Sequence, residues 1–139
     1  MTVAIEPEVK GPIGQPRDAK KSQALLQEAL TLKQAKKTAE AVAKLEEAIK
    51  ADGQNAGAWV ALTEIRAATD GVEAFTSLCK RWFAAMPKNY QAHNVLGRYL
   101  EAKGKPADAM AEYKKSLEIE WNQPPTIEAK ARLEKLIQP

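Results

Sequence analysis

The 139-residue sequence has little of the chemistry on which enzymes, metal sites and disulfide scaffolds depend. Cys79 is its only cysteine, so no disulfide can form within the chain. His93 is its only histidine, so a Cys/His zinc cluster is excluded. The seven glycines are isolated or lie near the N-terminus, and none forms a phosphate-binding loop. We therefore predict a non-catalytic protein without cofactor or metal, with Cys79 in the core and His93 at the surface or in the groove.

Long apolar runs and a strong charge of one sign are also missing. No stretch approaches the roughly 18 consecutive apolar residues that cross a bilayer. Residues 1–17 contain acidic residues and prolines where a signal peptide needs an uninterrupted apolar core. The net charge of +3 is spread along the chain, which favours solubility over nucleic-acid binding. We expect a cytoplasmic protein that neither inserts into membranes nor binds nucleic acid.

What the sequence does contain is helix-forming residues. Alanine, leucine, lysine and glutamate dominate, and 45% of residues are hydrophobic while 28% are charged. Those residue types favour helix, and that balance is typical of a globular protein. The length predicts a single all-α domain.

Residues 90–123 have the pattern of a complete helix-turn-helix unit. Two runs repeat apolar residues at three- and four-residue spacing, as one buried stripe of a helix requires: Ala92, Leu96, Tyr99 and Leu100, then Ala109, Tyr113 and Leu117. Between the runs, Gly104 tolerates the left-handed backbone that ends a helix, and Pro106 suits the first turn of the next. The pattern predicts an antiparallel helical hairpin.

The pattern of this hairpin recurs with a period of 34 residues. Small residues then fall into two columns, the first formed by Ala29, Thr63 and Gly97 and the second by Ala41, Ala48, Ala109 and Ser116. Small side chains allow antiparallel helices to approach closely. A fixed period with such columns indicates a helical solenoid.

The residues at these columns resemble the tetratricopeptide repeat (TPR) family over about residues 22–123. The resemblance rests on Trp59-x-x-Leu62 with Pro87, on Leu96-Gly97 with Ala109 and Tyr113, and on Ala41, Leu45 and Ala48. It implies a right-handed α-solenoid of three repeats with a C-terminal capping helix. The expected parts are a leader (1–17), repeat 1 (18–55), repeat 2 (56–89), repeat 3 (90–123) and the capping helix (124–139).

Several residues are candidates for helix caps. Asp18, with Ser22 as the rival, is expected to cap the first helix, Thr38 the second and Asn55 the third. Residues 70–73 have the spacing of a capping box for the fourth helix.

Two later helices differ in their apolar content. The fourth is apolar on more than one face, which predicts a buried helix: Val72, Phe75, Leu78, Cys79, Trp82, Phe83 and Met86. The last, over 126–138, sets apolar residues among charges and is expected to cover the core with a polar back: Ile127, Ala131, Leu133, Leu136 and Ile137.

Residues 1–17 do not have a helical pattern, because three prolines and two glycines interrupt them. Val3, Ile5, Val9 and Ile13 are nevertheless apolar, which is unusual for a solvated tail. The leader is either disordered or an extended segment that docks on its own chain or on a neighbour.

The resemblance implies that the concave groove, lined by the first helix of each repeat, holds a peptide of a partner protein. The positions expected to face it are Leu26, Leu30, Val60, Glu64, Asn94, Arg98 and Glu101. Asn94 and Arg98, one turn apart, could bind a peptide backbone and its carboxylate. Some family members clamp the terminal carboxylate of heat-shock chaperones with lysines and asparagines, but Leu26, Leu30 and Glu64 depart from that set.

We therefore predict a protein–protein interaction adaptor that binds a partner peptide. One alternative is a self-assembling scaffold, in which the leader or the terminal helix mediates homo-oligomerisation. Another is a small secretion-type chaperone, since some of these are three-repeat TPR proteins. Plain helix surface is the competing interpretation for each groove position.

Overall fold

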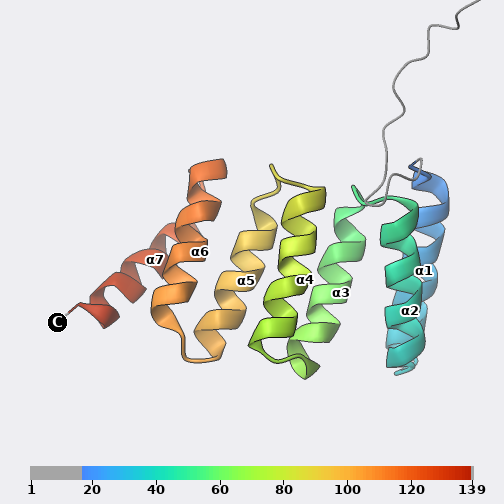
Figure 1. The fold of residues 1–139 in the computed structure, drawn as a ribbon, viewed down its shortest axis with the longest axis horizontal. Helices are drawn as coiled ribbons and strands as arrows, with labels where there is room; N and C mark the ends of the chain where they lie inside the picture. The colour runs from blue at the N-terminus through green and yellow to red at the C-terminus, as the bar shows by residue number, and fades with distance from the viewer. Residues whose placement is uncertain (1–16, 139) are drawn as a thin grey trace, which may run out of the picture. The chain divides into compact units, whose positions relative to one another are not determined.

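The computed structural model describes residues 17–138, which form seven α-helices and no strand (Figure 1). This confirms the all-α prediction. The helices are α1 (Ala19–Gln34), α2 (Thr38–Ala51), α3 (Ala56–Thr69), α4 (Val72–Ala85), α5 (Gln91–Ala102), α6 (Pro106–Ile119) and α7 (Pro124–Ile137). No helix in this part of the chain is long and apolar enough to cross a membrane.

The chain divides into two compact units, Met1–Ile65 and Arg66–Pro139, with the boundary inside α3. The leader predicted over 1–17 lies outside the described residues except for Arg17. Arg17 Nε donates to the Asp52 carboxylate at 2.8 Å, just beyond the end of α2. Burial alone would raise the pKa of Asp52, but hydrogen bonds from Arg17 and from the backbone N–H of Gln54 hold it below its usual value.

In the first unit, α1 and α2 pack closely because small residues face each other. Ala41 and Ala48 are fully buried, and the Ser22 hydroxyl donates to the Ala48 carbonyl at 2.7 Å. Asp18 caps α1 as predicted, since its carboxylate accepts from the backbone N–H of Lys21. The Ser22 side chain points instead into the α1–α2 contact.

The predicted Thr38 cap is wrong. Lys36, in the α1–α2 turn, has φ of 62°, and Lys37 occupies the N-cap position without a side-chain bond. Thr38 is thus already the first helical residue. Asn55, by contrast, caps α3 as predicted: its side-chain oxygen accepts from the N–H of Ala58 at 3.2 Å.

In the second unit, α5 and α6 form the predicted hairpin. Gly104 has φ of 77°, in the left-handed region, and Pro106 is the first residue of α6. Gly97 lies against the ring of Tyr113, where an added Cβ would be 2.6 Å from Cε1. The small-residue column therefore marks a real close approach at this hairpin.

Helix α4 is buried on one side, through Phe75, Leu78, Cys79 and Trp82. Val72, Phe83 and Met86 are only half-buried and residues such as Ser77 and Lys80 are exposed, so the expectation of a helix buried on more than one face is met in part. The Phe75 ring stacks on Tyr99 of α5 with centroids 4.0 Å apart. Burial, together with the charge of Glu112, raises the pKa of the Cys79 thiol to about 12, as suits a core residue.

The predicted capping box at residues 70–73 is wrong. Gly71 is the N-cap residue of α4 and makes no side-chain bond. The Asp70 carboxylate lies 3.6 Å from Arg66, and its carbonyl accepts from the Tyr99 hydroxyl.

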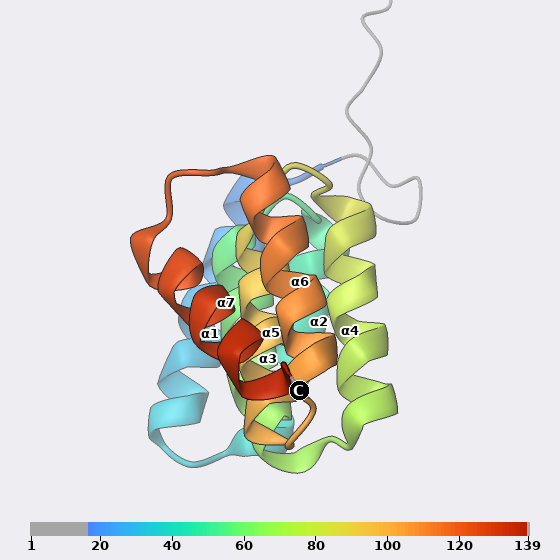
Figure 2. The ribbon, with the colours of Figure 1, turned by 90° about the vertical axis from the view of Figure 1, so that its left-hand side faces the viewer.

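Helix α7 packs against α6, and its outer side faces the viewer in Figure 2. Among its described residues only Thr126 and Leu133 are buried. Ile127 is 45% exposed and Leu136 is 70% exposed. Of the apolar residues expected to cover the core, only Leu133 is buried, while the polar back is present as expected. Ile127 lies about 120° around the helix from Leu133, and Leu136 lies on the Leu133 side but in the last turn.

Candidate functional site

The predicted groove residues fall on both units. Leu26, Leu30, Val60 and Glu64 lie on α1 and α3 in the first unit, whereas Asn94, Arg98 and Glu101 lie on α5 in the second.

On the first unit, Leu30 of α1 and Val60 of α3 are half-buried, so each leaves apolar surface to solvent. Leu26 is buried, at 7% exposure, and lies close to Gly57 of α3. It supports this surface from beneath and does not line it. Leu30 and Val60 therefore form a short apolar strip on the first unit.

An ion pair joins α1 to α3 beside that strip. Lys33 Nζ lies 2.9 Å from the Glu64 carboxylate, and both side chains are exposed. Exposed pairs contribute little, about 0–1 kcal/mol, so either charge can exchange its partner for that of a ligand at small cost.

On the second unit, side chains from three helices meet at Glu101 of α5. The Tyr113 hydroxyl of α6 donates to Glu101 Oε1 at 2.9 Å, and Arg132 of α7 lies 2.6 Å from Oε2. Burial, followed by the hydrogen bond to Glu101, raises the pKa of Tyr113 to about 12, although Arg98 and Arg132 oppose the shift. Glu101 is therefore a fixed, partly buried carboxylate.

Arg98 of α5 is exposed. It is one helical turn from Glu101 and near enough to Tyr113 to influence its pKa. Because Glu101 is already occupied by two donors, Arg98 remains the accessible charged group of this α5 face.

Asn94 does not belong with these side chains. It is only 8% exposed. Its amide nitrogen donates to Gln123 Oε1 at 2.7 Å, and its oxygen accepts from the Thr126 hydroxyl. Ser116 of α6 completes this buried network through Gln123 Nε2. The expectation that Asn94 offers hydrogen bonds to a peptide is thus not met by this conformation, because those bonds hold α7.

A hollow of about 510 Å³ lies over α7 in the second unit. It is lined by Pro125, Glu128, Ala129, Ala131, Arg132 and Lys135. Arg132 belongs both to this lining and to the contact with Glu101, so the hollow adjoins the α5 face. Sequence reasoning missed the α7 residues, because charges on a terminal helix have the pattern of a solvated surface.

His93, which we predicted to lie at the surface or in the groove, is half-buried. Its ring stacks on Phe83 with centroids 3.9 Å apart, and Nδ1 lies 2.9 Å from Glu112 Oε1. Burial would raise the pKa of Glu112, but hydrogen bonds from His93 and Lys115 lower it. Because its pKa is lowered, the Glu112 side chain is an ionised carboxylate and can only accept hydrogen bonds. His93 Nδ1–H is therefore the donor to Glu112 Oε1. The Cys79 thiol is near enough for the Glu112 charge to raise its pKa, but it is fully buried, so we assign the pair a packing role.

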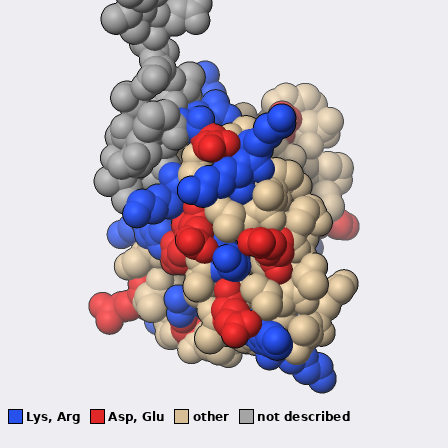
Figure 3. Space-filling view, turned by 90° about the vertical axis from the view of Figure 1, so that its right-hand side faces the viewer, with Lys and Arg blue, Asp and Glu red and all other residues tan. Residues whose placement is uncertain are grey.

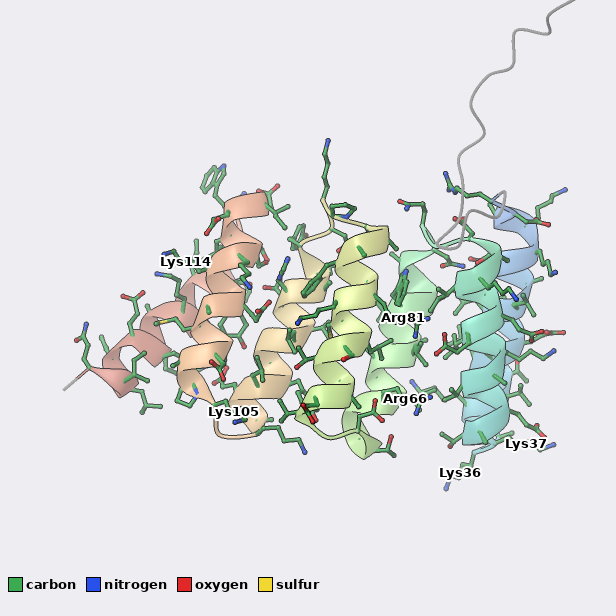
Figure 4. The ribbon with its side chains drawn as sticks, in the orientation of Figure 1. Lys36, Lys37, Arg66, Arg81, Lys105 and Lys114 are labelled. Atoms are coloured by element: carbon green, nitrogen blue, oxygen red, sulfur yellow. The ribbon has the colours of Figure 1, made fainter. Side chains whose placement is uncertain are left out.

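Charged side chains are dispersed. On the side where α1 and α2 lie in Figure 1, Lys/Arg and Asp/Glu alternate, as Figure 3 shows. Lys36 and Lys37 project from the α1–α2 turn, whereas Lys105 and Lys114 stand on the α5–α6 hairpin of the other unit (Figure 4). Within residues 17–138, no group of three or more His, Cys, Asp and Glu could hold a metal ion.

Comparisons with known proteins show which family and which solved structures this chain resembles. Residues 66–124 match the family model described as tetratricopeptide repeat. A search of curated protein sequences found no match.

Three solved structures are similar. The first TPR of Spaghetti (RPAP3), bound to the HSP90 peptide SRMEEVD, is 18% identical, with a TM-score of 0.69, over 87% of this chain and 96% of that one. The OM64 TPR domain of Arabidopsis is 22% identical, with a TM-score of 0.68, over 86% and 98%. The Yersinia enterocolitica type III secretion chaperone SycD, in complex with a peptide of the translocator YopD, is 17% identical, with a TM-score of 0.64, over 86% and 92%. Likeness at this level of identity concerns the fold.

Proposed function

Because residues 66–124 belong to the tetratricopeptide repeat family and the chain has that family's fold, we propose that this protein is a non-catalytic interaction adaptor that binds a peptide segment of a partner protein. Two of the similar structures hold a peptide, which supports this class of function. A cytoplasmic location and the absence of nucleic-acid binding remain predictions.

The observation that carries the proposal is the surface of the second unit at α5 and α7. It combines an exposed cation, Arg98, with the fixed carboxylate of Glu101 and a hollow of about 510 Å³ over α7. An extended peptide needs partners for its side chains and its polar backbone, and this surface offers charge beside small apolar residues. Arg98 is the group that we expect to bind a carboxylate of the ligand.

The first unit offers a different contact. Leu30 and Val60 would take an apolar side chain of the ligand, and Lys33 and Glu64 would exchange their weak mutual ion pair for charges of the ligand. We propose Leu26 as a support for this surface and Asn94 as a support for α7.

A display library of random 12-residue peptides, screened on the full chain, tests the proposal. We expect enrichment of acidic sequences, and Arg98→Glu should weaken the selected peptides at least about tenfold, or roughly 1.4 kcal/mol. Lys114→Glu, a charge reversal of the same sign on α6, is the matched control and should leave affinity unchanged. A screen that yields no binder, or binders indifferent to Arg98→Glu, would refute the proposed site.

A further inference from the structure

The large hydrophobic side chains exposed among residues 17–138 are concentrated near the C-terminal end of the second unit. They are Ile119, Trp121, Ile127, Leu136 and Ile137. Three of them belong to α7, whose inner side carries the buried Thr126 and Leu133. At 100° per residue, Ile127 borders the side of α7 opposite Leu133, whereas Leu136 and Ile137 lie in the last turn on the Leu133 side. The outer side of α7 is therefore an unpartnered face with one exposed apolar residue, Ile127, at its edge.

The centre of that outer face carries two opposite charges at a defined spacing. Glu128 and Lys135 are both exposed and both line the hollow over α7. Seven residues apart, they lie two turns apart on one side of the helix, opposite Leu133. Neither belongs to an ion pair within the described part of the chain, whereas Lys130 and Glu134 on the same helix pair with each other at 2.6 Å.

We propose that this face binds a second copy of the same chain, with the two α7 helices antiparallel. A twofold axis midway between Glu128 and Lys135 places Glu128 of each copy opposite Lys135 of the other, so one surface makes two ion pairs with itself. Such self-complementarity is what a twofold interface requires. A sequence with two charges of the same sign at these positions would repel its copy.

The residues around the axis fit this pairing. Ala131 lies next to the axis, and its small side chain allows the helices to approach to about 8–10 Å. About this axis Leu136, at 70% exposure, is level with Ile127 of the other helix, which is 45% exposed. The two Arg132 side chains would come close together, but each is already bound by Glu101 of its own chain at 2.6 Å, which limits their repulsion.

One helix face on each side makes a small interface, below the roughly 1,200 Å² of total buried surface that stable complexes exceed. We therefore expect a weak dimer that forms only at high protein concentration and dissociates as salt screens the ion pairs. The proposal does not rest on peptide binding, although a dimer would cover part of the hollow.

Charge exchange between two variants tests the pairing. Sedimentation velocity of the full chain at low salt, from about 10 µM to 1 mM, should show a monomer–dimer equilibrium for the natural sequence. Glu128→Lys and Lys135→Glu should each weaken it at least about tenfold, since each creates two like-charge pairs. Lys114→Glu, on α6, should leave it unchanged. Circular dichroism should show equal helix content in all variants.

The mixture is the decisive sample. A Glu128→Lys chain and a Lys135→Glu chain should each be monomeric alone, yet form a heterodimer together, because the two pairs are then opposite in charge again. The double variant should dimerise like the natural chain. A natural chain that stays monomeric throughout the range overturns the proposal. So does a dimer that is insensitive to the single reversals, or a mixture that stays monomeric.

Discussion

The close approach of α5 and α6 at Gly97 makes a quantitative prediction about Gly97→Ala. A Cβ at this position would lie 2.6 Å from Cε1 and 2.8 Å from Cδ1 of Tyr113, which is closer than carbon atoms pack. The ring has little freedom to retreat, because it is 3% exposed and its hydroxyl is bound to Glu101 at 2.9 Å. Overpacking of this kind costs about 1–3 kcal/mol.

A second effect acts in the opposite direction. Alanine is favoured over glycine inside a helix by about 1 kcal/mol. The net loss for Gly97→Ala is therefore about 0–2 kcal/mol, a range that includes no change, so the single variant does not separate the two effects. The coupling energy between positions 97 and 113 separates the two effects. The preference of the helix for alanine over glycine is the same whether or not the Tyr113 ring is present, so it cancels in this coupling energy.

The assay is a double-mutant cycle with Tyr113→Leu, measured by urea denaturation followed by circular dichroism. In the Tyr113→Leu chain, Gly97→Ala should stabilise by about 1 kcal/mol, so the coupling should be about 1–3 kcal/mol. Gly57→Ala is the control, because its Cβ would meet the end of the Leu26 side chain at 3.0 Å and the Asn55 side-chain oxygen at 3.4 Å, and not Tyr113. Whatever its effect on stability, that effect should be the same in both chains, because Gly57 has no contact with Tyr113. If Gly97→Ala has the same effect with and without the ring, the argument from close packing fails.

Two further predictions concern other parts of the second unit. The lowered pKa of Glu112 implies a contribution to stability that is present above the ordinary carboxyl pKa of about 4.3 and lost as pH falls through the folded pKa. Glu112→Gln, which weakens the bond with His93, should therefore lower the melting temperature at pH 7 and flatten its decline below about pH 5; an unchanged decline would contradict this. Trp121 is 74% exposed while Trp59 and Trp82 are buried, so acrylamide should quench one tryptophan component strongly, and Trp121→Phe should remove it.

The sequence predicted those features that depend on neighbouring residues. The turn at Gly104 and Pro106, and the caps at Asp18 and Asn55, follow from local backbone chemistry, and the structure confirms them. The prediction that Thr38 caps α2 failed for a related reason. The preceding turn is closed by Lys36 with positive φ, and no glycine marks that position.

Features that depend on distant residues were not predictable. The carbonyl of Asp70 is taken by Tyr99, 29 positions away, and the start of α4 falls after Gly71. The amide of Asn94 is taken by Gln123, also 29 positions away. A groove position and a buried support have the same local pattern, so only the tertiary contact distinguishes them.

The way α7 is attached has a consequence for its motion. Two of its described residues are buried, Thr126 and Leu133, and much of its anchoring is through hydrogen bonds around Gln123. Among its residues only Leu133, with Ala129 packed at the edge, joins the hydrophobic core of this unit, so opening of this terminal helix costs less free energy than global unfolding. The backbone amides of α7 should therefore exchange with deuterium through a local opening, well before those of α5 and α6. The protein would then exist in solution as a folded body with a terminal helix that detaches and rebinds.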